Sequence, residues 1–262
     1  MTQRPSILEI GNLVKTYDTG QRAVDGLSLR VPAGSIFGFI GLNGAGKTTT
    51  IRIVTGLLGR DAGSVTLFGR ELDPGDLETK RAIGVVLDEP LYFDWMPAAE
   101  YLRFVGVMEG LSRETADARA EELLHFFDLS DRGQDPIDTY STGMKKKVSL
   151  AAAVIHTPRL VILDEPLEGI DAVASSAIKG ALAMMAARGT TIFITSHVMD
   201  TVERFCTDIA IVHKGKVVLE CRTDEIRSRA KGDLSHETFA SLEELFVETV
   251  SDNTKRRHLS FL

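Results

Sequence analysis

The sequence predicts an α/β fold with a mainly parallel core sheet, an N-terminal antiparallel β subdomain and an inserted helical subdomain. Three observations lead to this prediction. Short apolar strands alternate with helical stretches over most of the chain, which favours a parallel sheet with helices on both faces. The first third is rich in β-branched and apolar runs separated by Gly, Asp and Pro. From about residue 98 to 156 the spacing is helical instead.

Each element is expected from its own local pattern. In the first third, strands are predicted in the segments ILEIGNLVKTY, AVDGLSLRV, SIFGFIG, GSVTLFG and AIGVVL, with a helix starting at about Gly46. The helical subdomain contains AAEYLRFVGVMEGL, SRETADARAEELLHFFDL and a helix from residue 141 to about 156. The alternation then resumes with RLVILD, the helix DAVASSAIKGALAMMAARG, TTIFIT, a helix from about Val198, and the strands DIAIVH and KVVLE.

The composition is that of an ordinary globular protein. Of the 262 residues, 44% are hydrophobic and 26% charged, which is enough for a full core. The net charge of -7 argues against a broadly basic surface, so no nucleic-acid partner is expected. The two cysteines, Cys206 and Cys221, lack a metal-type spacing, which favours a reduced cytosolic setting.

Two units are expected along the chain. Residues 6–230 form the main unit, with its helical subdomain at about 98–156, and residues 231–262 form a C-terminal helical extension and tail. The region after about residue 223 shows one amphipathic segment, LEELFVETV, and then a charged end. No stretch has the roughly 20 apolar residues of a membrane helix, and the start MTQRPSILEI lacks the apolar core of a signal peptide. Any membrane part is therefore expected in another chain.

A glycine-rich loop predicts a phosphate site. The segment GLNGAGKT matches G-x-x-x-x-G-K-[ST] between an apolar strand and a helix, the context that a P-loop requires. Gly44 and Gly46 let the backbone amides point at phosphate oxygens, Lys47 adds a positive charge, and the Thr48 hydroxyl is a ligand for Mg²⁺. The alternative is a simple glycine-rich turn. The predicted nucleotide-binding residues of this loop are Gly41, Leu42, Asn43, Gly44, Ala45, Gly46, Lys47, Thr48 and Thr49.

A pair of acidic residues follows a later apolar strand. In LVILDEP, Asp164 lies at the carboxyl edge of the predicted sheet, where open α/β folds bind ligands, and is the candidate Mg²⁺ ligand. Glu165 follows it and is a candidate to polarise the water that attacks the γ-phosphate. The alternative is a solvated Asp-Glu pair. These motifs together indicate a P-loop NTPase and leave kinases, GTPases and helicases open.

A second helix start, YSTGM, separates these classes. A Ser-x-Gly helix tip shortly before Asp-Glu-Pro resembles the ATP-binding cassette of ABC transporters, over about residues 6 to 250. The resemblance implies that this signature segment closes over ATP held by a second copy in a head-to-tail dimer, so that each ATP lies between Lys47 of one copy and residues 141–143 of the other. The signature residues are Ser141, Thr142, Gly143 and Met144.

Other landmarks of the family fall in order. The resemblance implies that Tyr17 stacks on adenine, that Asp171 in the segment EGID couples the two sites, and that His197 contacts the γ-phosphate. The implied catalytic residues are Glu165, His197 and Lys47, with ATP and Mg²⁺ as cofactors. A strand-edge aromatic is the alternative for Tyr17, and a surface histidine is the alternative for His197.

The sequence departs from the family pattern at several positions. Asp88 stands where the family has a glutamine that senses Mg²⁺ and links the site to the membrane partner, so Asp88 is a candidate coupling residue and Mg²⁺ ligand. Thr142 and Met144 replace a glycine and a glutamine of the signature segment. Glu168 replaces a small serine, and Cys221 replaces a glycine after the last strand. Hydrolysis is expected to survive, with altered rate and coupling.

The resemblance implies an ATPase subunit that powers transport through a separately encoded permease. YSTGM, DEPLYFDWMPAAEYL and LEELF look like exporter-type cassettes, which implies a homodimer, or a heterodimer with a second cassette, on the cytoplasmic face of the membrane. Three alternatives remain: a soluble ABC ATPase, a nucleotide-dependent regulator with little turnover, and a P-loop small-molecule kinase.

Two further segments allow specific expectations. The three lysines at 145–147 are expected on a solvated helix face, or alternatively facing the partner's ATP. The aromatic segment LYFDWMP, residues 91–97, is expected to expose Trp95 or Phe93 for burial by the permease, with local packing as the alternative.

Overall fold

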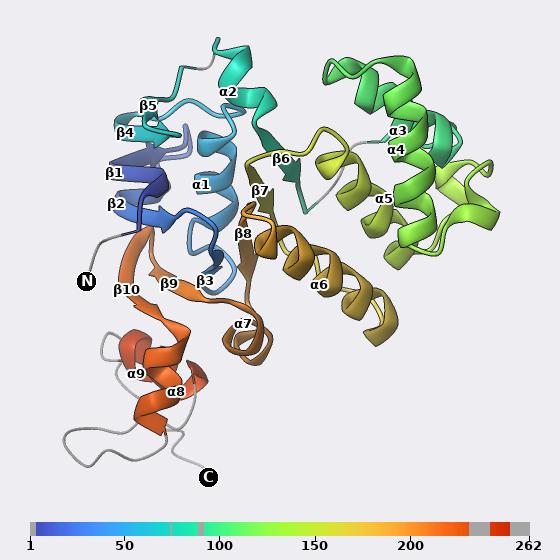
Figure 1. Cartoon of the computed structure of the whole chain (residues 1–262). Helices are drawn as coiled ribbons and strands as arrows, with labels where there is room; N and C mark the ends of the chain where they lie inside the picture. The colour runs from blue at the N-terminus through green and yellow to red at the C-terminus, as the bar shows by residue number, and fades with distance from the viewer. Residues whose placement is uncertain (1–3, 74, 89–91, 231–241, 252–262) are drawn as a thin grey trace.

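The computed structural model describes residues 4–73, 75–88, 92–230 and 242–251. It contains two β-sheets with helices around them (Figure 1). The smaller sheet is antiparallel, with strand order β2-β1-β4-β5. Its strands are β1 (Ser6–Thr16), β2 (Arg22–Pro32), β4 (Ala62–Leu67) and β5 (Arg70–Glu71). The predicted N-terminal antiparallel subdomain is thereby confirmed.

The larger sheet is the core of the fold. Its strand order is β10-β9-β3-β8-β7-β6, and every neighbouring pair is parallel except β9 with β10. The strands are β3 (Ile36–Ile40), β6 (Ile83–Val86), β7 (Leu160–Leu163), β8 (Thr191–Ser196), β9 (Asp208–His213) and β10 (Lys216–Arg222). β3 and β7 are short apolar runs buried along their whole length, as is typical of central parallel strands. The mainly parallel sheet is therefore confirmed.

Helix α1 (Lys47–Val54) lies between the two sheets (Figure 1). Its buried side chains, such as Ile51 and Ile53, join Phe37 and Phe39 of β3 and the inner face of the antiparallel sheet in one apolar cluster. Because α1 follows β3 directly, this packing fixes the loop between them at the carboxyl end of β3. A short helix, α2 (Leu77–Arg81), follows the antiparallel sheet and was not predicted; Asp76 caps it.

Three longer helices follow β6. They are α3 (Ala98–Met108), α4 (Arg113–Phe126) and α5 (Thr142–Val154), with 3₁₀ turns at Ser130–Arg132 and Ile137–Thr139 between α4 and α5. Ser112 begins α4 by accepting a hydrogen bond from the Thr115 amide. These helices lie on one side of the core sheet in Figure 1. The division of the chain at 230 and the subdomain limits of 98–156 stay predictions.

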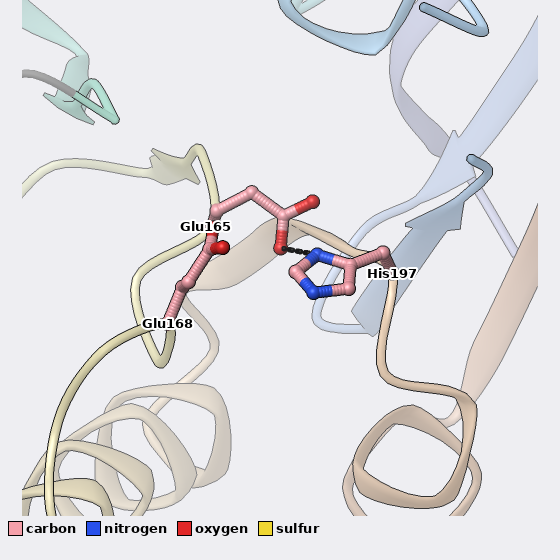
Figure 2. Close-up of side chains that lie close together, drawn as sticks. All are labelled: Glu165, Glu168 and His197. Atoms are coloured by element: carbon pink, nitrogen blue, oxygen red, sulfur yellow. Dashed lines mark hydrogen bonds and ion pairs between the residues drawn. The ribbon is translucent and has the colours of Figure 1, made fainter. Parts of the chain in front are cut away.

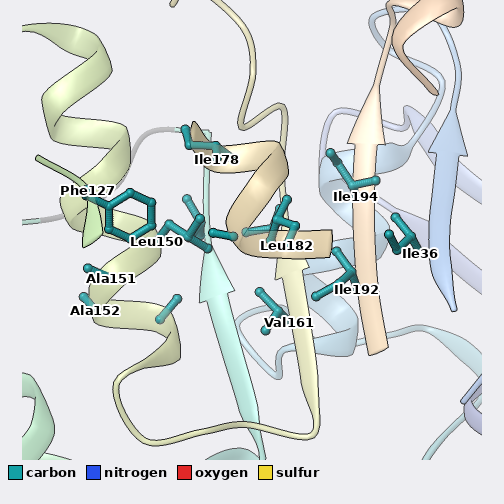
Figure 3. Close-up of a cluster of buried hydrophobic side chains, with 14 of the residues drawn as sticks. Ile36, Phe127, Leu150, Ala151, Ala152, Val161, Ile178, Leu182, Ile192 and Ile194 are labelled. Carbon is teal, nitrogen blue, oxygen red and sulfur yellow. The ribbon is translucent and has the colours of Figure 1, made fainter. Parts of the chain in front are cut away.

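The second apolar cluster joins the core sheet to α6 (Ala172–Ala187) and α5. Figure 3 shows Ile178 and Leu182 of α6 between Leu150 of α5 and the sheet residues Val161 and Ile192. Helix α7 (Met199–Phe205) also contributes to this cluster. The cluster holds α5 and α6 against each other and against the strands that carry the candidate site.

The C-terminal region differs from the expectation in two respects. A helix, α8 (Thr223–Ala230), follows β10, where no helix was predicted. Cys221 lies within β10 opposite Ile209, and not after the last strand. Helix α9 (Leu242–Ser251) is the predicted amphipathic segment: Leu242 and Phe246 are buried, and the Leu242 amide donates to Glu203 of α7 at 3.0 Å. The charged end, residues 252–262, lies outside the described residues.

Candidate nucleotide site

Three neighbouring strands bring the predicted site residues to one edge of the core sheet. The glycine-rich loop follows β3, Asp164 follows β7, and His197 follows β8. In the sheet β8 lies between β3 and β7, and all three strands are parallel. Their carboxyl ends therefore meet at the edge where open α/β sheets bind ligands.

The loop before α1 has the geometry that the glycine pattern predicted. Gly46 has φ 105°, and a Cβ atom at this position would lie 2.4 Å from the carbonyl oxygen of Ala23. Only glycine fits there, both for its conformation and for its close approach to β2. No side chain caps the first turn of α1, so its amides are open to an anion.

A cavity of about 400 Å³ lies over this loop. Most of the predicted nucleotide-binding residues line it, together with the candidate coupling residue Asp88 and with Glu168. At one end, the Tyr17 hydroxyl shares a hydrogen bond of 3.1 Å with Thr49 Oγ1. The lining residues are Tyr17, Gln21, Ala23, Leu42, Asn43, Gly44, Ala45, Gly46, Lys47, Thr48, Thr49, Asp88, Glu165 and Glu168.

Lys47 lies at the base of this cavity with 6% of its side chain exposed. Its ammonium group donates to the carbonyl oxygen of Gly41 at 2.8 Å and lies 3.3 Å from Oε1 of Glu165. The lysine is thus held between the loop and the acidic residue that follows β7. A buried charge is costly unless it is paired, and these two contacts supply the pairing.

Asp164 has one satisfied carboxylate oxygen and one unsatisfied oxygen. Oδ1 accepts a hydrogen bond of 2.5 Å from the Thr195 hydroxyl, whereas Oδ2 is buried without a hydrogen-bond partner among the described residues. A buried unpaired carboxylate oxygen is costly unless it meets a cation, so this atom fits a Mg²⁺ ligand. The predicted ligand set of Thr48, Asp164 and Asp88 stays a prediction.

Thr195 was missed by the sequence reasoning. Its hydroxyl oxygen, buried at the end of β8, donates to Asp164 and accepts a hydrogen bond of 2.9 Å from the Glu165 amide. One side chain therefore orients both acidic residues. The available signal was a threonine at the end of the apolar run TTIFIT, two residues before His197.

Glu165 and His197 contact each other in the site. The Glu165 Oε2 atom lies 3.1 Å from Nδ1 of His197, and Figure 2 shows this contact next to Glu168. The ligand atoms of these three side chains lie within 4.8 Å of one another. Glu165 also has φ 47°, the left-handed region that side chains rarely adopt. The carboxylate is therefore placed by an unusual backbone and by contacts to Lys47 and His197.

The predicted signature segment begins α5. Ser141 precedes the helix, and its Oγ accepts a hydrogen bond of 3.3 Å from the Met144 amide. Ser141 and Thr142 are exposed, whereas Gly143 is buried; a Cβ atom at 143 would lie 3.1 Å from Ala174. Asp171 caps α6 beside this point through a 2.8 Å bond from the Ala174 amide. Within the described chain, residues 141–144 do not line the cavity over the glycine-rich loop.

The expectation of a solvated face for the lysines at 145–147 was wrong for Lys147. Lys147 is buried, and its ammonium group donates to the carbonyl oxygen of Phe127 at the end of α4. Lys146 donates to the carbonyl oxygens of Glu165 and Glu168. Lys146 is half-buried, and both ammonium groups are bound within the same chain. Three adjacent lysines at the start of a helix gave no sign of these distant partners.

Comparison with known proteins assigns this site to a family. The family model described as ABC transporter matches residues 24–168, which is more than half of the chain. This chain belongs to the ABC transporter family. Over 245 residues it is 34% identical to the linearmycin resistance ATP-binding protein LnrL of Bacillus subtilis (strain 168), covering 93% of this chain and 78% of that protein. It is 36% identical to the daunorubicin/doxorubicin resistance ATP-binding protein DrrA of Streptomyces peucetius, covering 87% and 68%.

A solved structure agrees with these relatives. The structure of the ATP-binding subunit of an ABC transporter superposes with a TM-score of 0.83 at 32% identity, and covers 93% of this chain and 99% of that one. The chain is accordingly an ATP-binding and ATP-hydrolysing subunit of the ABC type, a family whose ATP-binding subunits dimerise and work with transmembrane components. In the described part of this ABC subunit, no helix combines the length and apolar character needed to cross a membrane.

Proposed function

We propose that this ABC subunit hydrolyses Mg²⁺-ATP to power export through a separate transmembrane permease. Lys47 contacts the β- and γ-phosphates, Glu165 polarises the attacking water, and His197 contacts the γ-phosphate. The observation that carries these assignments is the meeting of Lys47, Glu165 and His197 within hydrogen-bond or ion-pair distance at the carboxyl ends of β3, β7 and β8.

Phosphoryl transfer depends chiefly on positioning and on compensation of charge. Glu165 is an acceptor for a proton of water, and the neighbouring His197 orients its carboxylate. Thr195 accepts a hydrogen bond from the Glu165 amide, which fixes the backbone from which the carboxylate extends. When bound, Mg²⁺ neutralises charge on the phosphate oxygens. Its proposed ligands are Thr48 and the unpaired oxygen of Asp164, with Asp88 as a further candidate.

The proposed active form is a head-to-tail dimer. Residues 141–144 of one copy close over ATP held by the other copy, Asp171 couples the two sites, and Tyr17 stacks on adenine. The exposure of Ser141 and Thr142, away from the cavity of their own chain, supports this arrangement. A heterodimer with a second, different cassette would have the same head-to-tail arrangement.

The proposed cargo is an antibiotic-like compound. It is supported by the relatives, which are named for resistance to linearmycin and to daunorubicin/doxorubicin. An exposed aromatic patch made of Phe93, Trp95 and Phe104 supports a separate permease as the partner: their exposed fractions are 46%, 69% and 41%. The Phe93 ring centroid lies 6.3 Å from that of Trp95 and 5.6 Å from that of Phe104. The subunit would then lie on the cytoplasmic face of the membrane.

The single tryptophan of the chain provides a direct test. Trp95 fluorescence of the isolated subunit should be strongly quenched by acrylamide. The protein should then be titrated with nanodiscs that hold the permease with which it co-purifies, and with empty nanodiscs as the control. The proposal is supported if permease-containing nanodiscs protect Trp95 from acrylamide and stimulate ATP turnover, whereas empty nanodiscs do neither. Turnover that is unaffected by the permease, with Trp95 equally quenched throughout, would favour a soluble ABC ATPase.

A further inference from the structure

Lys146 connects two parts of the chain that serve different ATP molecules in the proposed dimer. It lies on α5, five residues after Ser141. Its ammonium group donates to the carbonyl oxygen of Glu165 at 2.8 Å and to that of Glu168 at 2.7 Å. A single side chain of the signature helix therefore spans the turn that carries the residue assigned to the attacking water.

The backbone of Glu165 is held from both sides. Its amide donates to Thr195 on β8, and its carbonyl oxygen accepts hydrogen bonds from Lys146 and from the Glu168 amide. Its φ of 47° is a conformation that persists only where the surroundings impose it. β8 is central in the sheet, so the contact of Glu165 with Thr195 is fixed by the sheet itself. The contact with Lys146 depends instead on the position of α5 against the sheet.

The charges around Lys146 support the same contact. Asp88, Glu165 and Glu168 oppose the effect of burial, which lowers the pKa of the Lys146 ammonium group. All three acidic residues also line the cavity over the glycine-rich loop. Three carboxylates thus attract the charge of the lysine, and two of them, at 88 and 168, are departures from the family pattern.

We infer that Lys146 is a positioning residue that couples the two ATP sites within each protomer. When residues 141–144 contact the partner's ATP, any displacement of α5 moves the donor that fixes Glu165 over the protomer's own ATP. The link is continuous, from Ser141 along α5 to Lys146 and then to Glu165. This inference rests on the proposed function, because that function assigns the roles of Glu165 and the signature segment.

The test compares Lys146→Met with Lys146→Arg and with Lys145→Met in the full-length protein. Lys146→Met should lower kcat about tenfold to a hundredfold and change KM for ATP less than about threefold, because the P-loop contacts remain while the carboxylate is misplaced. Lys146→Arg keeps a donor for both carbonyls and should restore kcat to within about threefold. Lys145→Met removes the same charge one residue away and should stay within about twofold of the wild type.

Two further readouts separate coupling from a general structural role. The cooperative dependence of wild-type turnover on ATP concentration should be lost in Lys146→Met. In a Glu165→Gln background, Lys146→Met should leave the ATP-trapped dimer intact, because the dimer interface does not require this contact. If Lys146→Met does not fold, Lys146→Leu, which also lacks a donor, replaces it with the same expected loss of kcat.

Wild-type kcat in a folded Lys146→Met or Lys146→Leu variant would overturn the inference. Loss of the trapped dimer when Lys146→Met is added would also overturn it, since Lys146 would then act on assembly. Failure of the proposed function looks different: the wild type itself would show no turnover and Glu165→Gln no dimer, and the inference would fail with it.

Discussion

Lys47 and Glu165 form an ion pair within the nucleotide cavity, with 3.3 Å between Nζ and Oε1 and about a tenth of each side chain or less exposed. The P-loop lysine is therefore already engaged by the residue assigned to the attacking water. A γ-phosphate that binds Lys47 has to compete with this carboxylate, which also repels it.

Glu165→Gln should for this reason raise the affinity for Mg²⁺-ATP about threefold to tenfold, since a neutral amide competes more weakly for Lys47. Calorimetric titration at a protein concentration that keeps the subunit monomeric measures this change. Glu168→Gln is the matched control because it removes the same charge from the same cavity without a contact to Lys47. Equal gains in both variants would show that net charge alone is responsible.

Thr195→Val should destabilise the fold by about 1–3 kcal/mol, because Asp164 and the Glu165 amide both lose a buried partner while the volume is kept. ATP turnover should fall as well. Urea unfolding and steady-state kinetics measure the two effects. Thr195→Ser keeps the hydroxyl and should retain most of both. Unchanged turnover in a stably folded Thr195→Val would mean that this hydroxyl does not orient the acidic pair.

Asp88→Asn tests whether Asp88 helps to hold Mg²⁺. If it does, the Mg²⁺ concentration for half-maximal turnover should rise about threefold to tenfold, because a carboxylate ligand is lost. Asp94→Asn, the same change of charge at an exposed residue outside the cavity, should leave that concentration unchanged. An identical Mg²⁺ requirement in Asp88→Asn and the wild type would exclude Asp88 as a ligand.

His156 predicts a component of the pH dependence of stability. Burial lowers the pKa of His156, opposed by Glu109 and reinforced by the positive charge of Arg119. As the pH falls through about 6.5, the unfolded chain then binds more protons than the folded chain. This contribution to stability is therefore lost as the pH falls, by at most about 1.4 kcal/mol per pH unit. Urea unfolding at pH 7.5 and 5.5 should therefore show a smaller loss for His156→Gln than for the wild type. An equal loss in both proteins would contradict this assignment.

Local sequence patterns predicted which segments form the central strands. The runs IFGFI and LVIL are apolar throughout because both faces of central parallel strands are buried, and that pattern is visible without a structure. The glycine-rich loop was equally readable, because its glycine spacing between an apolar strand and a helix is local in the sequence. The close approach of Gly46 to Ala23 of β2 is visible only in the structure.

Contacts between distant segments could not be predicted in the same way. A lysine run reads as a solvated face unless the position of α5 over the turn after β7 is known, and Thr195 looks like one more β-branched residue of a strand. Helix α8 was missed because TDEIRSRA has no apolar periodicity; Ile226 is its buried apolar anchor among the described side chains.

The most direct test of the account measures ATP turnover and oligomeric state together, with Mg²⁺-ATP, for the wild type and Glu165→Gln. We expect that the wild type hydrolyses ATP and that Glu165→Gln does not but accumulates as an ATP-bound dimer. Turnover in Glu165→Gln at the wild-type rate would contradict the role given to Glu165. A Glu165→Gln subunit that binds ATP and stays monomeric, with and without its permease, would contradict the head-to-tail dimer.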